Sequence, residues 1–223
     1  MHAQGLNANQ TISSFLDEEL GKESLAVFNG IRFYDLLKSN KEDFRYFESY
    51  KPFKATITYN GQSYPNIPAR YDLINDHLVV YSEGKLSFFQ TQIANSKVDA
   101  FLLDNLSFVR LDLSIKYAKE KNAFYELAYD GKNLDLFIAW SKAEKLKTNI
   151  QNPYYTFKLS QEYFFLLNEE YFQIKSKNDI IKLFPERKKE IREFYKAYKD
   201  IERKNHKQFM QKLAFYLDQN LKN

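Results

Sequence analysis

The chain has 223 residues, of which 44% are hydrophobic, enough to bury a core in one large domain or two small ones and too many for a disordered chain. Its formal net charge of +4 comes from 33 Lys and Arg residues nearly balanced by 29 Asp and Glu residues, so charge alone does not indicate a nucleic-acid-binding protein. Cysteine is absent, which excludes thiol catalysis, cysteine-ligated zinc and disulfide bonds.

Two features favour an exported protein. Avoidance of cysteine is typical of many envelope proteins, because an unpaired thiol outside the cytoplasm is open to oxidation. Ala3 followed by Gln4 resembles the residue pair left after cleavage of a signal peptide, and the alternative is an ordinary start before a loose tail. No apolar run approaches the roughly 20 residues that span a bilayer. We therefore expect an exported protein without a transmembrane span.

The first 40 residues are predicted to form a tail and a short helical segment. Residues 1–11 are small and polar, as in a loose terminus. Residues 11–17 open with Thr11 and end in Asp17, which suits a short helix because a hydroxyl caps the first amides and an acidic residue favours the first turn. Residues 22–40 mix helical and extended character around a turn at Asn29-Gly30.

From residue 53 to residue 141 the pattern changes to that of β-strands. Residues 53–59 alternate apolar and polar side chains with a period of two, the pattern of a half-buried strand. Asn60-Gly61 then supplies the positive φ angles of a type I′ hairpin turn. Because proline cannot donate to a ladder, Pro65 and Pro68 reduce the next stretch to an edge strand or an irregular crossing.

Further short strands follow, separated by turn pairs such as Asn75-Asp76, Asp104-Asn105 and Asp130-Gly131. A final hairpin with a turn at Asn168-Glu169 is expected over residues 154–174. The predicted strands cover residues 71–74, 78–81, 86–89, 101–103, 108–111, 124–129, 134–140, 155–159, 163–167 and 171–174.

After residue 174 the periodicity becomes helical. Residues 176–184 predict a short helix that is capped by Ser176 or Asn178 and ends before Pro185. Residues 186–199 carry an apolar stripe at helical spacing. A further helix is expected to begin at Asn205, where Gln208 three residues later outlines a capping box, and a break is expected near 200–205.

These elements predict an α+β fold: a mainly antiparallel β meander, either a sandwich or an open barrel, with short N-terminal helices and a C-terminal helical pair. The predicted organisation is a tail and short helical segment over 1–40, a β-rich domain over 41–175, and helices over 176–223 that pack on the same domain.

No catalytic motif is recognisable. The three histidines stand at positions 2, 77 and 206, and neither a zinc-protease motif, a serine elbow nor a glycine-rich phosphate loop occurs. We therefore predict no catalytic residue, no metal site and no cofactor. Asp72 and Glu126 lie between apolar neighbours inside strands, so each is expected to be buried in a structural ion pair, with Arg70 and Arg110 as the suggested partners.

The longest basic run, Arg187-Lys188-Lys189, is flanked by glutamates. Glu186 with Lys189, and Lys189 with Glu193, have the spacing of ion pairs along a helix. This run therefore indicates a solvated helix face, and no nucleic-acid partner is predicted.

Aromatic residues make up 17% of the chain, and cross-strand packing accounts for most of them. Exposed aromatic side chains on a sheet could instead bind a glycan or another protein. The candidate interface residues are Tyr59, Tyr64, Tyr71, Tyr81 and Trp140.

Three stretches together resemble a family of uncharacterised exported proteins of Bacteroidota that carry a signal peptide. They are ATITYNGQSYPNIPARYDLINDHLVVY, FYELAYDGKNLDLFIAW and YFQIKSKNDIIKLFPERKKEIREFYKAYK, and the resemblance covers roughly residues 45–221. The resemblance implies a periplasmic or outer-membrane-associated location and carries over no catalytic residue.

The sequence favours a non-enzymatic cell-envelope protein, an accessory or binding subunit of an outer-membrane or surface assembly. Its expected partner is another envelope protein, and peripheral association with a membrane stays open. One alternative is a periplasmic carrier of a lipid or other apolar ligand, which would need a cavity lined by Phe and Leu. A second is a carboxylate-based glycan hydrolase, which would need two carboxylates facing each other across a cleft.

Overall fold

The computed structural model describes residues 25–37, 39, 42–82, 89–113, 123–148 and 151–221. The chain divides into two compact units. The N-terminal unit is Met1–Asp104 with Glu144–Lys158, and the C-terminal unit is Asn105–Ala143 with Leu159–Asn223. This division differs from the boundaries at 40 and 175 that the sequence suggested, because the β-rich region contributes strands to both units. The predicted helix at 11–17 lies outside the described residues.

The predicted fold class is confirmed. Eleven strands and four α-helices occur in the described parts of the chain, the strand pairs are antiparallel, and the sheet does not close into a barrel. The four helices include the predicted C-terminal pair.

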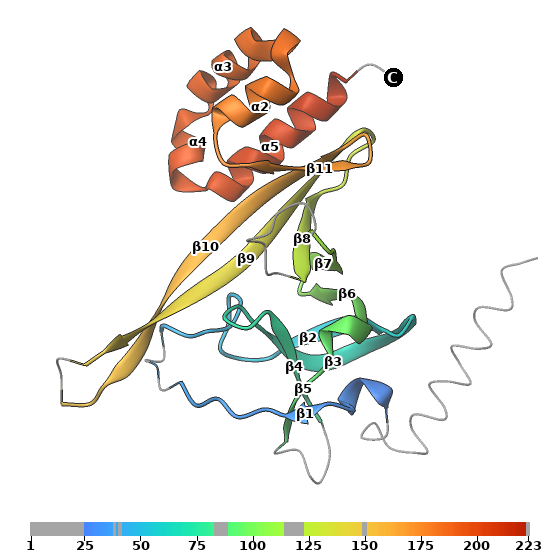
Figure 1. The fold of residues 1–223 in the computed structure, drawn as a ribbon, viewed down its shortest axis with the longest axis vertical. Helices are drawn as coiled ribbons and strands as arrows, with labels where there is room; N and C mark the ends of the chain where they lie inside the picture. The colour runs from blue at the N-terminus through green and yellow to red at the C-terminus, as the bar shows by residue number, and fades with distance from the viewer. Residues whose placement is uncertain are drawn as a thin grey trace, which may run out of the picture. The chain divides into compact units, whose positions relative to one another are not determined.

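The N-terminal unit is built on six strands with the order β1-β5-β4-β3-β2-β6 (Figure 1). Two short 3₁₀ helices, η2 (Ala26–Phe28) and η3 (Asn95–Lys97), accompany them. The strands are β1 (Ile31–Arg32), β2 (Phe53–Tyr59), β3 (Gln62–Asp72), β4 (His77–Tyr81), β5 (Gln90–Gln92) and β6 (Val98–Leu103).

The β2–β3 hairpin confirms the predicted turn. Asn60 and Gly61 adopt φ angles of 50° and 75°, and Tyr59 pairs with Gln62 across the turn. The carboxylate of Asp99 accepts a hydrogen bond of 2.8 Å from the amide of Gly61. Alternate residues of β2 are buried, as its period of two predicted.

The two prolines do not interrupt β3, contrary to the prediction of an edge strand or irregular crossing. This strand runs for 11 residues and pairs with both β2 and β4. However, β4 pairs only with residues 69–72 of β3, so Pro65 and Pro68 lie in the half that has β2 alone as a neighbour. Pro65 also falls where the register between β2 and β3 shifts. Both prolines therefore occupy positions where a missing amide donor is tolerated.

The C-terminal unit is a meander with the order β7-β8-β9-β10-β11 (Figure 1), except that residues 144–147 of β9 and 154–158 of β10 belong to the N-terminal unit. The prediction of separate strands at 155–159 and 163–167 was wrong, because residues 154–167 form one strand. The polar residues between the two apolar runs are largely exposed and include no Gly or Pro, so nothing breaks the strand. The strands are β7 (Leu106–Arg110), β8 (Phe124–Tyr129), β9 (Leu134–Lys147), β10 (Tyr154–Leu167) and β11 (Glu170–Ile174).

Four α-helices and one 3₁₀ helix follow β11, and in Figure 1 they gather beside it. Helix α2 contacts β11, and α5 packs on β8. The break predicted near 200–205 is present only at Asn205, because residues 199–204 form helix α4; a second interruption lies at Tyr198. The helices are α2 (Lys177–Leu183), η4 (Pro185–Arg187), α3 (Lys188–Ala197), α4 (Lys199–Lys204) and α5 (His206–Gln219).

Helix α5 begins with half of the predicted capping box. The side chain of Asn205 accepts a 2.9 Å hydrogen bond from the amide of Gln208. The reciprocal half does not form, because the amide of Asn205 already donates to the carbonyl of Ile201. The buried face of α5 holds the residues Phe209, Met210, Leu213, Ala214, Leu217 and Asp218.

Asp218 is the one charged residue on that buried face, and it holds the turn between β8 and β9. Its carboxylate accepts hydrogen bonds from the amides of Lys132 and Asn133 and from the hydroxyl of Tyr129, at 2.8–3.1 Å. Burial alone would raise the pKa of Asp218, but these hydrogen bonds lower it below the ordinary value. Gly131 is needed here because a Cβ would lie 2.8 Å from the Asp218 carboxylate.

Candidate anion-binding pocket

Asp72 forms the buried ion pair that the sequence predicted, but with a different partner. It is 0% exposed, and Arg45 donates to both of its carboxylate oxygens, at 2.9 and 2.5 Å. Arg70, the predicted partner, instead places its guanidinium over three aromatic rings, at 4.4–5.0 Å from their centroids. The partner was missed because Arg45 lies in an irregular segment 27 residues earlier in the chain.

Glu126 repeats this outcome in the C-terminal unit. It is 1% exposed and accepts hydrogen bonds from the indole of Trp140 at 2.8 Å and from the ammonium of Lys207 at 2.6 Å. The predicted partner Arg110 is exposed and pairs in register with Phe124. The ion-pair prediction is therefore confirmed for both carboxylates, while both predicted partners are wrong. Each carboxylate is already neutralised by a cation.

The aromatic residues proposed as an interface lie mostly inside the protein. Four of them are only 1–6% exposed, and the fifth, Tyr81, is half-buried. The four buried side chains are those of Tyr59, Tyr64, Tyr71 and Trp140. The packing interpretation of these residues agrees with their burial, because side chains so buried offer little surface to a partner.

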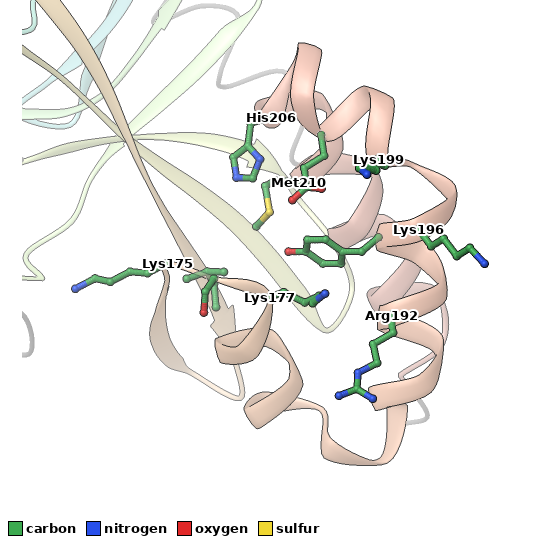
Figure 2. A pocket seen from close by; sticks show the side chains of 11 residues that line it. Lys175, Lys177, Arg192, Lys196, Lys199, His206 and Met210 are labelled. Atoms are coloured by element: carbon green, nitrogen blue, oxygen red, sulfur yellow. The ribbon is translucent and has the colours of Figure 1, made fainter.

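A pocket of about 410 Å³ lies within the C-terminal unit (Figure 2). Its walls come from the end of β11, the start of α2, and helices α3, α4 and α5. Cationic side chains dominate its lining, and Glu202 is the single carboxylate among them. The cations are Lys175, Lys177, Arg192, Lys196 and Lys199.

Helical spacing explains why several of these cations line the same pocket. On α3, Ile191 and Phe194 are buried, so Arg192 and Lys196, which are four residues apart, lie on the exposed face. Lys199 continues that face at the start of α4. Lys177 is the first residue of α2, which therefore delivers a further cation from the opposite wall.

None of these five cations forms an ion pair with a carboxylate of the described residues. Lys177 instead places its ammonium 5.3 Å from the ring centroid of Tyr195. Two other lysines of the same unit are paired, Lys207 with Glu126 and Lys182 with Asp179. With five cations and one carboxylate, the lining of the pocket carries a net positive charge.

The predicted ion pairs of Lys189 do not form among the described residues. Instead, Arg187, which is 16% exposed, forms ion pairs with Glu186 and Glu190 at 3.8 and 4.0 Å. Its guanidinium also donates to the carbonyl of Asn220, which holds it near these glutamates. The carboxylates near the start of α3 are thus directed away from the pocket cations.

The pocket wall also includes the side chains of Tyr195 and His206. Partial burial raises the pKa of Tyr195, so its hydroxyl keeps its proton at neutral pH and stays a hydrogen-bond donor. The ring of His206 packs edge-on against Tyr163, with ring centroids 5.0 Å apart. Partial burial lowers the pKa of His206, and the nearby carboxylate of Glu202 opposes this effect. His206 is therefore mostly neutral at neutral pH.

One signal in the sequence could have indicated this pocket. Arg192 has no carboxylate three or four residues away in either direction, unlike Lys189. The contributions of Lys175 and Lys177 could not be found in this way, because Lys175 follows β11 and Lys177 begins α2, both outside α3. In the described parts of the chain, no group of three or more His, Asp or Glu side chains is arranged to hold a metal ion.

None of the known protein-family models, curated proteins or solved structures compared with the chain matches it. No helix among the described residues combines the length and the hydrophobicity needed to cross a membrane.

Proposed function

We propose that this protein is a non-enzymatic binding protein of the cell envelope, an accessory subunit of an outer-membrane or surface assembly, and that it binds an anionic ligand in the pocket of its C-terminal unit. The observation that carries the proposal is the group of five cations in the pocket lining, which have no carboxylate partner within the described parts of the chain. The envelope location rests on the sequence, through the missing cysteines and the resemblance to exported proteins.

Electrostatics supports an anionic ligand. Like charges gathered around a concave surface repel one another, and the low-dielectric walls of a pocket strengthen the resulting field. An anion that enters the pocket relieves this repulsion. Because Arg192 and the lysines are exposed, the field also extends into solvent and favours the approach of negatively charged groups.

The two alternative functions receive less support from this site. An apolar ligand needs a cavity lined by Phe and Leu, whereas this pocket is lined mainly by charged side chains. A glycan hydrolase needs carboxylates that are free to exchange protons with a substrate. Asp72 and Glu126 are buried, and each is bound to a cation.

The proposal is tested by capture of partners from gently solubilised envelopes of the native host, with tagged protein. The pocket variant is Lys177→Glu with Lys199→Glu. The matched control, Lys188→Glu with Lys212→Glu, makes the same charge change at exposed sites on α3 and α5 outside the pocket. We expect a stoichiometric envelope partner with the wild type and the control, and its loss with the pocket variant. Recovery of the wild type alone would contradict the assembly role, and equal capture by both variants would contradict a role of the pocket.

A further inference from the structure

We propose that the anionic group bound in this pocket is the phosphate of a small phosphorylated molecule. This inference rests on the proposed function, because it assigns a ligand class to the same pocket. The amount of charge supports phosphate over carboxylate, the donors suit a phosphate, and the volume of the pocket limits the size of the ligand.

The amount of charge suits a multiply charged anion. Four lysines and one arginine line the pocket against a single carboxylate, that of Glu202. A phosphate monoester carries a charge of about −1.5 to −2 at neutral pH and offers three acceptor oxygens, whereas a carboxylate carries one charge and two oxygens. A phosphate therefore neutralises more of this excess from one position.

The donors are those that bind phosphate. Lysine ammonium groups act as compact point charges with three donors each, and both lysine and arginine are common phosphate ligands. Arg192 is the single arginine of the pocket. The hydroxyl of Tyr195 has no hydrogen-bond partner among the described residues and keeps its proton, so it can donate to a phosphate oxygen.

The directions of the side chains indicate which cations contact the anion. In Figure 2 Lys175 extends away from the pocket on one side, and Lys196 extends away on the other. Lys177 points across the pocket toward α3, where its ammonium lies beside the ring of Tyr195. We therefore assign a direct contact to Lys177, with Arg192 and Lys199 as the further cations of the lining, while Lys175 and Lys196 strengthen the field around the site.

The size of the pocket limits the ligand. A volume of about 410 Å³ lies near the lower end of the range for small-molecule sites, about 300–1,000 Å³. It suits a phosphate with one sugar-sized group attached. The same chemistry is offered by a free sugar phosphate and by the phosphorylated head group of a lipid.

Isothermal titration calorimetry at about 50 mM salt, where screening is weak, tests the ligand class. The probes are inorganic phosphate, pyrophosphate and a hexose phosphate, with citrate and an Asp/Glu-rich peptide as carboxylate probes. The variants are Lys177→Gln with Lys199→Gln for the pocket and Lys188→Gln with Lys212→Gln as the exposed control. We expect the hexose phosphate to bind at least about tenfold more tightly than citrate, and the pocket variant to weaken it by on the order of tenfold or more. The control should bind like the wild type.

The outcomes separate the two proposals. If the carboxylate probes bind as tightly as the phosphates, and the pocket variant weakens both, the ligand class is wrong and the anion-binding function stands. If the pocket and control variants bind every anion equally, both proposals fail, because binding then follows total charge rather than the pocket. Flotation with vesicles that contain a phosphorylated head group distinguishes the sources: recruitment that depends on Lys177 indicates a lipid, and its absence together with hexose phosphate binding indicates a free sugar phosphate.

Discussion

Replacement of Lys207 by Met should destabilise the C-terminal unit, because it leaves the carboxylate of Glu126 buried without its cation. Glu126 is 1% exposed and would keep only the hydrogen bond of 2.8 Å from the indole of Trp140 among its described side-chain contacts. Breaking a fully buried pair costs about 3–5 kcal/mol, and because Lys207 is 19% exposed, we expect about 2–4 kcal/mol. Trp140 is the single tryptophan of the chain, so its fluorescence during urea unfolding reports this unit directly.

The second arm of this experiment is the double variant with Glu126→Gln. A neutral glutamine can still accept a hydrogen bond from Trp140 and no longer needs a cation, so the double variant should recover part of the loss. We expect a coupling energy of about 1–3 kcal/mol between the two positions. A single Lys207→Met variant within about 0.5 kcal/mol of the wild type, or strictly additive effects, would refute the reasoning.

Replacement of Asp218 by Asn should cost about 1–3 kcal/mol at neutral pH, because two turn amides and a tyrosine hydroxyl lose a charged acceptor. The lowered pKa of Asp218 means that its contribution is present above the unfolded value of about 4 and is lost as the pH falls through the folded value, so wild type and variant should converge in acid denaturation curves. Gly131→Ala should reduce the free energy of unfolding by on the order of 1–3 kcal/mol and lower the melting temperature by several degrees, because the new Cβ would lie 2.3 Å from a backbone oxygen. An unchanged melting temperature would mean that the turn relaxes freely. The affinity for sulfate, whose charge is constant, should increase between about pH 8 and pH 5.5, because His206 gains a proton beside the pocket lysines while facing Glu202 and Tyr163. His206→Gln should remove that increase, and a variant that keeps it would assign the effect to another group.

The turns were the best-predicted part of the fold. Asn60-Gly61 and Asn168-Glu169 were recognised because positive φ angles favour Asn and Gly locally, and all four residues adopt them. Pro65 was wrongly taken as a sign of an edge strand or irregular crossing, because the consequence of a proline in a strand is not local. Its effect depends on which of its two sides has a neighbouring strand, and that pairing is set by residues far away in the chain.

Burial of charge was predictable, but its partners were not. Asp72 and Glu126 were identified as buried because apolar neighbours surround each of them within a strand. Arg45 and Lys207 bind them from an irregular segment and from the first turn of a helix. Sequence spacing indicates contacts only within one helix or one hairpin, so it cannot predict ion pairs between distant elements, such as these two.

The sequence alone determined the kinds of elements, their main turns and the identity of the charges, because these depend on side-chain periodicity and on local backbone preferences. The tertiary structure decided which charges are neutralised and which are not. Lys177 and Arg192 are unremarkable exposed cations on their own helices, and they become a site only because α2 and α3 each bury an apolar stripe against the same unit. The pocket is therefore a consequence of helix packing, which brings together charges that the sequence keeps apart.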